Sequence, residues 1–278
     1  MPLHGLRAQV LDHPALPALS AERYAVTHAL YEAASDQRAR LQDWLGTELP
    51  PLLTAHDPLR VVGVGVGDGS IDAPLAAALT WNGRRVRYTG VEPHPPSAAG
   101  FAQRLNGLGL PSLVPTVVIG DFADHDAGHP ADLVHFVHSL YYVADLSAAL
   151  DHALALVRPG GLLLSATAPR EPLCVLTELL CPWPGPKPWF AEDVLAELES
   201  RQLSVRTETL IGHLDVRDAL SDPLGRGEAV LDFLIGARSR ALTWQGRKQL
   251  LDYLGDISLP GRPGILPHPV DVTIARIP

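Results

Sequence analysis

Residues 61–69 read Val-Val-Gly-Val-Gly-Val-Gly-Asp-Gly, and an acidic residue, Glu92, follows 23 residues after the last of these glycines. A short apolar run that breaks into alternating glycines is typical of a buried strand that turns into a helix, where a ligand can lie against bare backbone. A carboxylate about 20 residues further on is placed to accept hydrogen bonds from ribose hydroxyls. These features predict a site for a nucleoside-containing cofactor.

Short apolar strands alternate with helical patterns after this loop. The alternation predicts an α/β fold with right-handed crossovers, a Rossmann-like sheet of about seven mostly parallel strands. We expect an N-terminal helical cap and further helices near the C-terminus, while five prolines make residues 170–190 irregular. Strands are predicted at 60–64, 85–91, 114–120, 132–138, 162–168, 204–214 and 270–277, and helices at 20–48, 71–79, 97–108, 146–157, 191–203 and 229–254.

Two regions are predicted along the chain. Residues 1–56 form an N-terminal arm and helical cap, and residues 57–278 form the cofactor-binding domain. Within this domain we expect insertions at about 170–190 and 215–265 to cover the substrate.

The composition excludes several classes of protein. The chain has 278 residues, 46% of them hydrophobic, and a formal net charge of −9, which argues against a nucleic-acid partner because phosphate binding needs a basic face. The sequence shows neither a run of 18 apolar residues nor a signal-peptide pattern, so we expect a cytoplasmic protein without a membrane partner. Cys174 and Cys181 lack the spacing of a zinc site, so buried thiols and no metal are expected.

The spacing of the glycines favours S-adenosylmethionine over a dinucleotide. The loop lacks the Gly-x-Gly-x-x-Gly pattern, and Asp68 would repel a pyrophosphate but tolerates a sulfonium and an amino group. Gly65, Gly67 and Gly69 are therefore assigned to S-adenosylmethionine, with Glu92 on its ribose. An NAD-dependent oxidoreductase stays open as an alternative, whereas a hydrolase lacks its Gly-x-Ser-x-Gly motif here.

Further candidate residues follow the predicted strands. Asp121 and Phe122 end the strand at 114–120, where the carboxylate could accept the adenine amino group and the ring could stack on adenine. His138 ends the next strand, at the edge of the sheet where ligands of open α/β sheets bind, whereas His135 lies deeper and reads as a core histidine.

Aromatic residues are candidates for the substrate side of the site. Tyr141 and Tyr142 could close over an aromatic or cationic substrate through their ring faces, or could pack against the next helix. Trp183 and Trp189 lie in the proline-rich stretch, where they would cover either a substrate pocket or the edge of the sheet.

The chain resembles the class I S-adenosylmethionine-dependent methyltransferases, and more closely the histamine N-methyltransferase family. The resemblance is carried by residues 64–72 (Val-Gly-Val-Gly-Asp-Gly-Ser-Ile-Asp), 91–93 (Val-Glu-Pro), 138–145 (His-Ser-Leu-Tyr-Tyr-Val-Ala-Asp) and 231–234 (Leu-Asp-Phe-Leu). It implies that Gly65 lines the cofactor, that Glu92 with the adjoining Pro93 holds the ribose, that Ser97 lies near it and that Val137 flanks the adenine.

The same resemblance implies residues that contact the acceptor. Tyr142 falls at a substrate-contacting tyrosine, and His138 stands where the histamine enzyme has a glutamine. His268 stands where that enzyme has a substrate-binding asparagine, and its acidic substrate anchor falls at Asp36 or Gln37. Because His138 and His268 replace residues that contact the acceptor in the histamine enzyme, the resemblance does not assign histamine as the substrate.

The predicted reaction is N-methylation of an imidazole or amine nitrogen in a small molecule or peptide, as in natural-product biosynthesis, with S-adenosylhomocysteine as by-product. A neutral nitrogen displaces the sulfonium methyl, and the enzyme aligns the reactants and excludes water. His138 could take the proton, and Asp36 could orient an imidazole N–H. The alternatives are an O-methyltransferase of a carboxylate or phenol and a non-catalytic S-adenosylmethionine-binding protein. The oligomeric state is not predicted.

Overall fold

The computed structural model describes residues 5–6, 16–54, 56–182 and 188–278. They form two compact units, each assembled from three stretches of the chain. The sheet unit comprises Ala39–Pro169, Pro188–Leu210 and Val270–Pro278, and the helical unit comprises the described parts of Met1–Arg38, Arg170–Lys187 and Ile211–Pro269. The boundaries 1–56 and 57–278 are a different division of the chain and stay a prediction.

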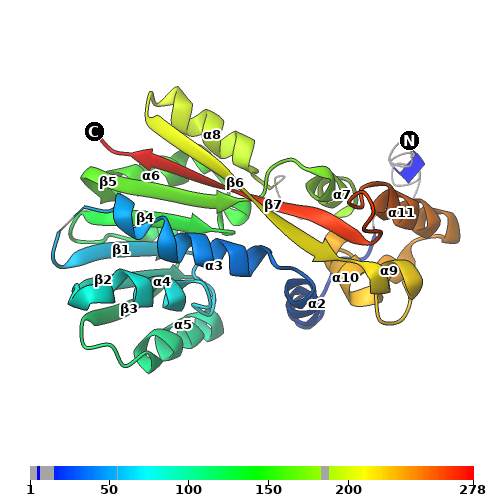
Figure 1. The fold of residues 1–278 in the computed structure, drawn as a ribbon, viewed down its shortest axis with the longest axis horizontal. Coiled ribbons are helices and arrows are strands. Elements are labelled where there is room, and N and C mark those ends of the chain that lie inside the picture. Colours follow the sequence, from blue (N-terminus) through cyan, green and yellow to red (C-terminus); the bar gives the residue numbers. More distant parts are fainter. Residues whose placement is uncertain (1–4, 7–15, 55, 183–187) are drawn as a thin grey trace. The chain divides into compact units, whose positions relative to one another are not determined.

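Seven strands form one sheet in the order β3-β2-β1-β4-β5-β7-β6 (Figure 1). Neighbouring strands from β1 to β5 run parallel, and β7 runs antiparallel to β5. The winding changes direction between β1 and β4, the point at which open α/β sheets bind ligands. The predicted α/β class with a mostly parallel seven-stranded sheet is confirmed. The strands are β1 Leu59–Val64, β2 Val86–Glu92, β3 Leu113–Ile119, β4 Ala131–Val137, β5 Val157–Thr167, β6 Ser204–Asp215 and β7 Ile265–Arg276.

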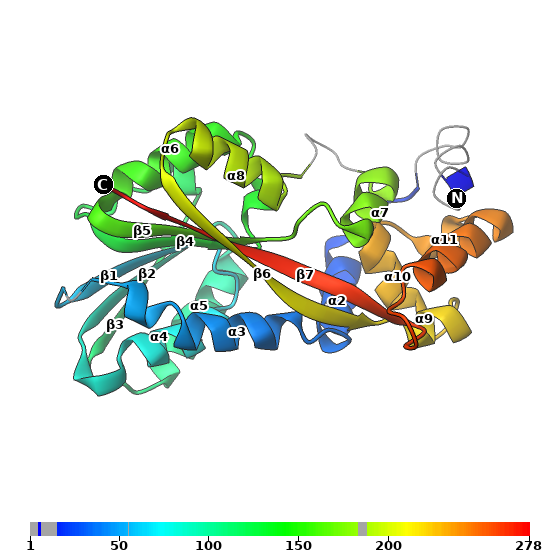
Figure 2. The same ribbon diagram turned by 45° about the horizontal axis from the view of Figure 1, so that its top comes forward.

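Helices lie on both faces within the sheet unit (Figure 2). Successive strand residues point to opposite faces, so Val61 joins one apolar cluster and Val62 the other. Helices α3, α4 and α5 contribute to the first cluster and α6 and α8 to the second. Their bounds are α3 Gln37–Thr47, α4 Asp72–Leu79, α5 Pro95–Gly107, α6 Leu146–Leu156 and α8 Ala191–Ser200.

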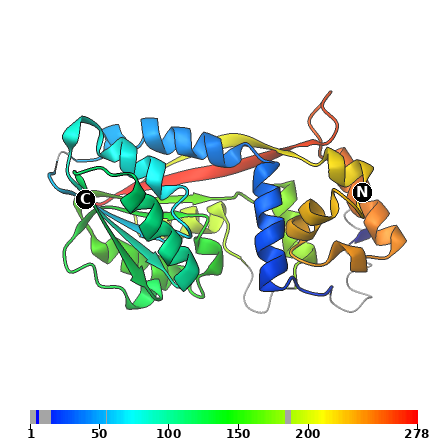
Figure 3. The ribbon, with the colours of Figure 1, turned by 90° about the horizontal axis from the view of Figure 1, so that it is seen from below.

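The helical unit is built around a core of leucines that includes Leu176, Leu231 and Leu250. Helices α2 and α10 are in contact within it (Figure 3). Its helices are α2 Ala21–Ala33, α7 Pro172–Leu180, α9 Arg217–Ser221, α10 Glu228–Ile235 and α11 Trp244–Asp256. Within the described residues, no helix is both long and apolar enough to cross a membrane.

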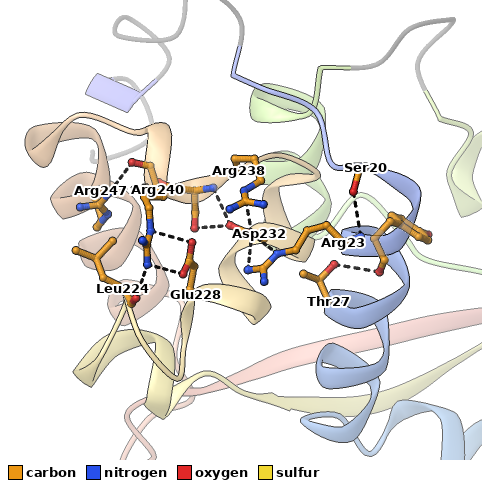
Figure 4. A network of polar contacts seen from close by, with 11 residues as sticks. Ser20, Arg23, Thr27, Leu224, Glu228, Asp232, Arg238, Arg240 and Arg247 are labelled. Carbon is orange, nitrogen blue, oxygen red and sulfur yellow. Dashed lines mark hydrogen bonds and ion pairs between the residues drawn. The ribbon is translucent and has the colours of Figure 1, made fainter.

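A buried carboxylate joins three elements of the helical unit (Figure 4). Asp232 on α10 is 0% exposed, and its Oδ2 accepts from Nε of Arg23 on α2 at 2.9 Å. Its Oδ1 accepts from the N–H and the hydroxyl of Ser239 at 2.8 and 2.6 Å. These hydrogen bonds compensate the desolvation of the buried charge and connect α2, α10 and the 3-10 turn η5 (Ser239–Ala241).

Two predicted helices are each divided. The helix predicted at 20–48 is broken between α2 and α3, because the backbone at residues 34–36 pairs with β6: the N–H of Asp36 donates to His213 O and that of Asp215 to Ala34 O. The helix predicted at 229–254 is broken after α10, where Gly236 adopts the left-handed conformation that ends helices. Helix α7 occupies part of the stretch expected to be irregular, and Pro172 is tolerated in its first turn.

Candidate functional site

The glycine-rich loop follows β1 at the carboxyl end of the strand. Gly65 has φ +65°, and a Cβ there would lie 2.5 Å from Cβ of Ser139, so a side chain would collide with the turn after β4. Gly67 has φ +55°, and no described atom lies within 4 Å of where its Cβ would be. The backbone of the loop therefore borders open space, as a ligand site of this kind requires.

Glu92, the last residue of β2, is hydrogen-bonded to the backbone of the glycine loop. It is 7% exposed; its Oε2 accepts the N–H of Gly67 at 2.8 Å and its Oε1 that of His94 at 2.9 Å. A carboxylate has about four acceptor positions, so both oxygens can still accept hydroxyl hydrogen bonds. The carboxylate is fixed beside Gly67, and its binding of the ribose stays a prediction.

Asp68 is ionised within the loop. Its Oδ2 lies 2.6 Å from Nη2 of Arg104, and its Oδ1 accepts the N–H of Ser70 at 3.0 Å. Burial opposes ionisation, but the hydrogen bonds from Ser70 and Arg104 outweigh it and hold the pKa of the carboxyl below its ordinary value. The loop thus contains an ionised carboxylate whose charge is paired with the guanidinium of Arg104.

Pro93 directly follows β2, and Ser97 lies in the first turn of α5. The hydroxyl of Ser97 lies 2.9 Å from Nδ1 of His94. Helix α5 also packs on the loop, since a Cβ at Gly100 would lie 3.2 Å from Cβ of Asp68. The start of α5, the end of β2 and the glycine loop therefore form one local assembly.

The residues predicted around the adenine follow β3 and β4. Asp121 accepts the N–H of the residue two positions on at 2.9 Å and begins the 3-10 turn η3 (Phe122–Asp124). Phe122 is 7% exposed and packs edge-to-face against Phe136 and His152. Core packing accounts for this ring, and its stacking on adenine stays a prediction. Val137 is half-buried at the end of β4.

A buried polar network lies beneath the loop. The hydroxyl of Tyr88 donates to Asp72 at 2.8 Å and lies 2.7 Å from Nε2 of His135. Burial lowers the pKa of His135 to about 4, and burial together with Asp72 raises the pKa of Tyr88. His135 is a neutral core histidine that lies 2.8 Å from where a Cβ of Gly63 would be.

His138 is held at the carboxyl end of β4 in an unusual conformation. Its φ of +52° lies in the left-handed region, which costs a non-glycine residue about 1–3 kcal/mol. Its Nδ1 lies 3.1 Å from the hydroxyl of Tyr141, and the two rings stack with centroids 6.0 Å apart. The Tyr141 oxygen accepts the N–H of Ala168 at 2.7 Å, which fixes the tyrosine and thereby the imidazole.

Two further aromatic residues lie near this turn. Tyr142 is 66% exposed and meets Tyr141 edge-on. The indole of Trp189 donates to the carbonyl of Val143 at 2.9 Å, and its ring packs on the second apolar cluster. The sheet unit therefore brings Trp189 to the residue next to Tyr142, whereas Trp183 lies outside the described residues.

Asp36 and Gln37 each have structural partners in the helical unit. Asp36 accepts the N–H of His213 at 2.6 Å, and its other oxygen lies 3.1 Å from Nδ1 of the same residue. The Gln37 amide is 6% exposed and donates to the carbonyls of His268 and Pro269 at 3.0 and 2.9 Å. Gln37 therefore fixes the start of α3 to β7, and its contact with a substrate stays a prediction.

His268 lies beside these two residues with both ring nitrogens engaged. Its Nε2 lies 2.7 Å from the hydroxyl of Tyr31 and its Nδ1 lies 2.7 Å from that of Ser35. Burial lowers the pKa of His268 to about 4, although Asp36 acts in the opposite direction. The ring is neutral at pH 7 and belongs to a partly buried polar cluster of the helical unit.

Three residues at these sites escaped the sequence analysis. The hydroxyl of Ser139 is buried against Gly65 and has no partner among the described residues. Ser139 directly follows His138 at the carboxyl end of a strand, and a polar residue at this position could have been predicted as a candidate site residue. Tyr31 and His213 reach His268 and Asp36 only through tertiary contacts, so local spacing could not have indicated them.

Neither a metal centre nor a disulfide is found among the described residues. Among them, no group of three or more His, Cys, Asp or Glu side chains is placed to hold a metal ion. Cys174 and Cys181 form no disulfide and are half-buried rather than fully buried, and burial raises the pKa of Cys181 to about 11.

The comparisons with known proteins place residues 62–163 in a family described as a methyltransferase domain. Histamine N-methyltransferase of Danio rerio is 22% identical over 260 residues, which cover 84% of this chain and 87% of that one. A ubiquinone biosynthesis O-methyltransferase of Methylobacterium sp. is 34% identical over 113 residues, 40% of this chain and 42% of that one. The structure of magnesium protoporphyrin IX methyltransferase from Synechocystis PCC 6803 has a TM-score of 0.50 and 16% identity, covering 97% of this chain and 93% of that one.

The chain is a class I S-adenosylmethionine-dependent methyltransferase, an enzyme whose methyl donor is S-adenosylmethionine. The residues present fit this cofactor: the open backbone at Gly67, the fixed carboxylate of Glu92 and the unpartnered hydroxyl of Ser139 lie around one loop. The predicted class and cofactor are confirmed, and the alternatives of an oxidoreductase and of a non-catalytic binding protein are set aside.

Proposed function

We propose that the enzyme methylates an imidazole or amine nitrogen of a small molecule or peptide. The observation that carries the proposal is the placement of His138, a titratable ring held in a strained conformation directly before the residue that packs on Gly65. Residues with strained backbone conformations are found preferentially at active sites and ligand-binding sites. The likeness to histamine N-methyltransferase supports a nitrogen acceptor because it extends over 84% of the chain, well beyond the cofactor loop.

The residues have distinct roles in the proposed reaction. S-adenosylmethionine, when bound, supplies an electrophilic methyl group, and the lone pair of the acceptor nitrogen forms the new C–N bond as the C–S bond breaks. Glu92 and Gly67 hold the cofactor, and His138 takes the proton that the methylated nitrogen loses. Tyr141 positions the imidazole through its 3.1 Å contact with Nδ1. Tyr142 and Trp189 offer ring faces to an aromatic or cationic acceptor.

The remaining substrate assignments rest on resemblance alone. Asp36, Gln37 and His268 are proposed as acceptor-binding residues of the helical unit, with Asp36 orienting an N–H of the acceptor. Asp36 is the best candidate of the three, since its side chain is 42% exposed while Gln37 and His268 are committed to buried contacts. An Asp36→Asn variant should raise KM for an imidazole acceptor more than it lowers kcat, and an unchanged KM would remove Asp36 from the assignment.

O-methylation of a phenol or carboxylate is the second candidate. The ubiquinone biosynthesis O-methyltransferase has the higher identity, 34%, but over only 40% of this chain. Because the cofactor part of the fold is shared among methyltransferases of many acceptors, a match of this extent supports the cofactor more than the acceptor.

Mass spectrometry of an acceptor panel tests the proposal. Imidazoles, histidine-containing peptides, amines, phenols and carboxylates are each incubated with enzyme and S-adenosylmethionine, and fragmentation locates any added methyl group. We expect transfer to nitrogen; transfer to oxygen acceptors alone would contradict the proposal.

A His138→Ala variant tests the role of the imidazole. We expect kcat to fall by about 10²–10⁴-fold, as for loss of a proton acceptor, while calorimetry shows an unchanged affinity for S-adenosylmethionine. In Tyr141→Phe, which keeps the imidazole but removes its hydrogen-bond partner, the fall should be smaller and the pH dependence of kcat should shift. Unchanged turnover in His138→Ala would remove His138 from the mechanism.

A further inference from the structure

One face of the sheet is left uncovered beside β3. Residues 120–130 are all described, and they contain no α-helix, only the turn η3 and irregular backbone. A crossover between parallel strands usually carries a helix that covers the sheet. On the face of the sheet that lies on the same side as α6, Val62 is 3% exposed, but the part next to β3 is open, and Val114 there is 56% exposed.

A hollow of about 230 Å³ lies on this face. Its floor consists of two rows of side chains that cross β1, β2 and β3 in register. The first row is Arg60, Arg87 and Val114, and the second is Val62, Thr89 and Thr116. His129, from the connection between β3 and β4, lines the rim. The hollow therefore combines two guanidinium groups, two hydroxyls and an imidazole with an apolar surface.

The two arginines are unusually placed for an acidic protein. Arg60 and Arg87 are directly paired residues on parallel strands, whose backbones lie about 5 Å apart, so both side chains rise from one face as neighbours. Within the part of the chain that the structure describes, neither guanidinium has a hydrogen-bond or ion-pair partner. In a chain with 31 acidic residues and a net charge of −9, two adjacent cations without a counter-charge indicate an anion that is supplied from outside.

We propose that this hollow binds the phosphate group of a small phosphate monoester. The residues that line it include no acidic side chain, so the polar groups act together as donors toward an anion. A phosphate monoester has three terminal oxygens, which can satisfy two guanidinium groups and the neighbouring hydroxyls more fully than the two oxygens of a carboxylate can. Val114, which is 56% exposed, contacts the organic part of the ligand.

This hollow is separate from the cofactor site. The cofactor residues Gly65 and Glu92 lie at the carboxyl ends of β1 and β2, whereas Arg60 and Arg87 lie near the amino ends of the same strands. Five residues of extended chain, from Arg87 to Glu92, span about 16 Å. A phosphate ester bound here would occupy a second ligand site on the enzyme.

Calorimetry with phenyl phosphate as the probe tests the proposal on the full chain at fixed ionic strength, with inorganic phosphate and benzoate for comparison. We expect one phenyl phosphate per chain, and about tenfold or greater weakening in Arg60→Gln and in Arg87→Gln, with unchanged affinity for S-adenosylmethionine. The control is Arg262→Gln, which removes an exposed arginine of the helical unit and should leave phenyl phosphate binding unchanged.

Three results would overturn the proposal. The first is a failure of the arginine test: the wild-type chain binds neither phenyl phosphate nor inorganic phosphate, or Arg60→Gln and Arg87→Gln bind them with the affinity of the wild type. The second is benzoate binding as tightly as phenyl phosphate, which would indicate a general anion site. The third is a wild-type dimer, seen by sedimentation, that dissociates in Arg60→Gln, which would assign the face to a second copy of the chain.

Discussion

At the scale of single residues, Gly65 illustrates how the cofactor loop depends on one backbone position. Its left-handed φ of +65° disfavours any other residue, and the neighbouring Ser139 leaves no space for a Cβ. The loop and the turn after β4 can therefore approach each other, which brings His138, the residue before Ser139, close to the glycine loop.

Replacement of Gly65 by alanine should weaken the binding of S-adenosylmethionine by tenfold or more, because the loop must move away from Ser139. The free energy of unfolding should fall by about 1–3 kcal/mol from backbone strain and overlap. Gly83→Ala is the matched control: Gly83 has φ +76° but no described atom within 4 Å of its Cβ position. Calorimetry should show normal cofactor affinity for that variant, and equal losses in the two variants would refute the explanation.

At the scale of elements, Asp232 shows how a buried charge can join helices of different sequence origin. Arg23 lies 209 residues away on α2, yet it donates to the same carboxylate that holds η5 through Ser239 (Figure 4). Removing one partner of a buried pair leaves the other without compensation, which is more costly than losing a surface pair.

We expect Asp232→Ala to lower the free energy of unfolding by about 3–5 kcal/mol, measured by urea denaturation. Asp252→Ala is the control, since Asp252 on α11 pairs with Lys248 one turn earlier and both side chains are exposed, 49% and 56% respectively. That variant should lose less than about 1 kcal/mol. Comparable losses in both variants would mean that burial of the Asp232 charge is not what stabilises the helical unit.

At the scale of the whole molecule, the described part of each unit contains a histidine whose pKa burial lowers far enough to keep the ring neutral at pH 7. His135 in the sheet unit and His268 in the helical unit both have a pKa lowered by burial to about 4, from an ordinary value of 6.5. The unfolded chain therefore binds protons between these values that the folded chain excludes. The contribution of each neutral histidine to the free energy of unfolding is complete above about pH 6.5 and is lost as the pH falls toward 4.

This linkage predicts a loss of about 3 kcal/mol per histidine between pH 6.5 and 4, in addition to the effect of the carboxylates. Hydrogen exchange followed by mass spectrometry can report the two units separately as the pH is lowered. His135→Asn should flatten the pH dependence in peptides of the sheet unit, and His268→Asn should do so in peptides of the helical unit. If neither variant changes the dependence, the buried histidines do not control acid stability.

Much of the fold could be predicted because its signals are local. The glycine loop, the two strands beside it and Glu92 lie within about thirty residues of sequence. The structure shows the carboxylate of Glu92 accepting the N–H of Gly67. The divided helices could not be predicted, because residues 34–36 leave the helix to pair with β6, far along the chain. The partners of Asp36 and His268 could not be predicted either, because His213 and Tyr31 lie far along the chain from the residues that they contact.

The sequence by itself determined the class of fold, the cofactor and the strand ends from which the site is built, because periodicity and turn chemistry are properties of neighbouring residues. Only the tertiary structure decided which residues become neighbours: Ser139 against Gly65, Tyr141 beside His138, and Arg60 in register with Arg87 on adjacent strands. Such contacts depend on strand order, register and the length of a connection, and the residues that form them carry no sign of one another in the chain.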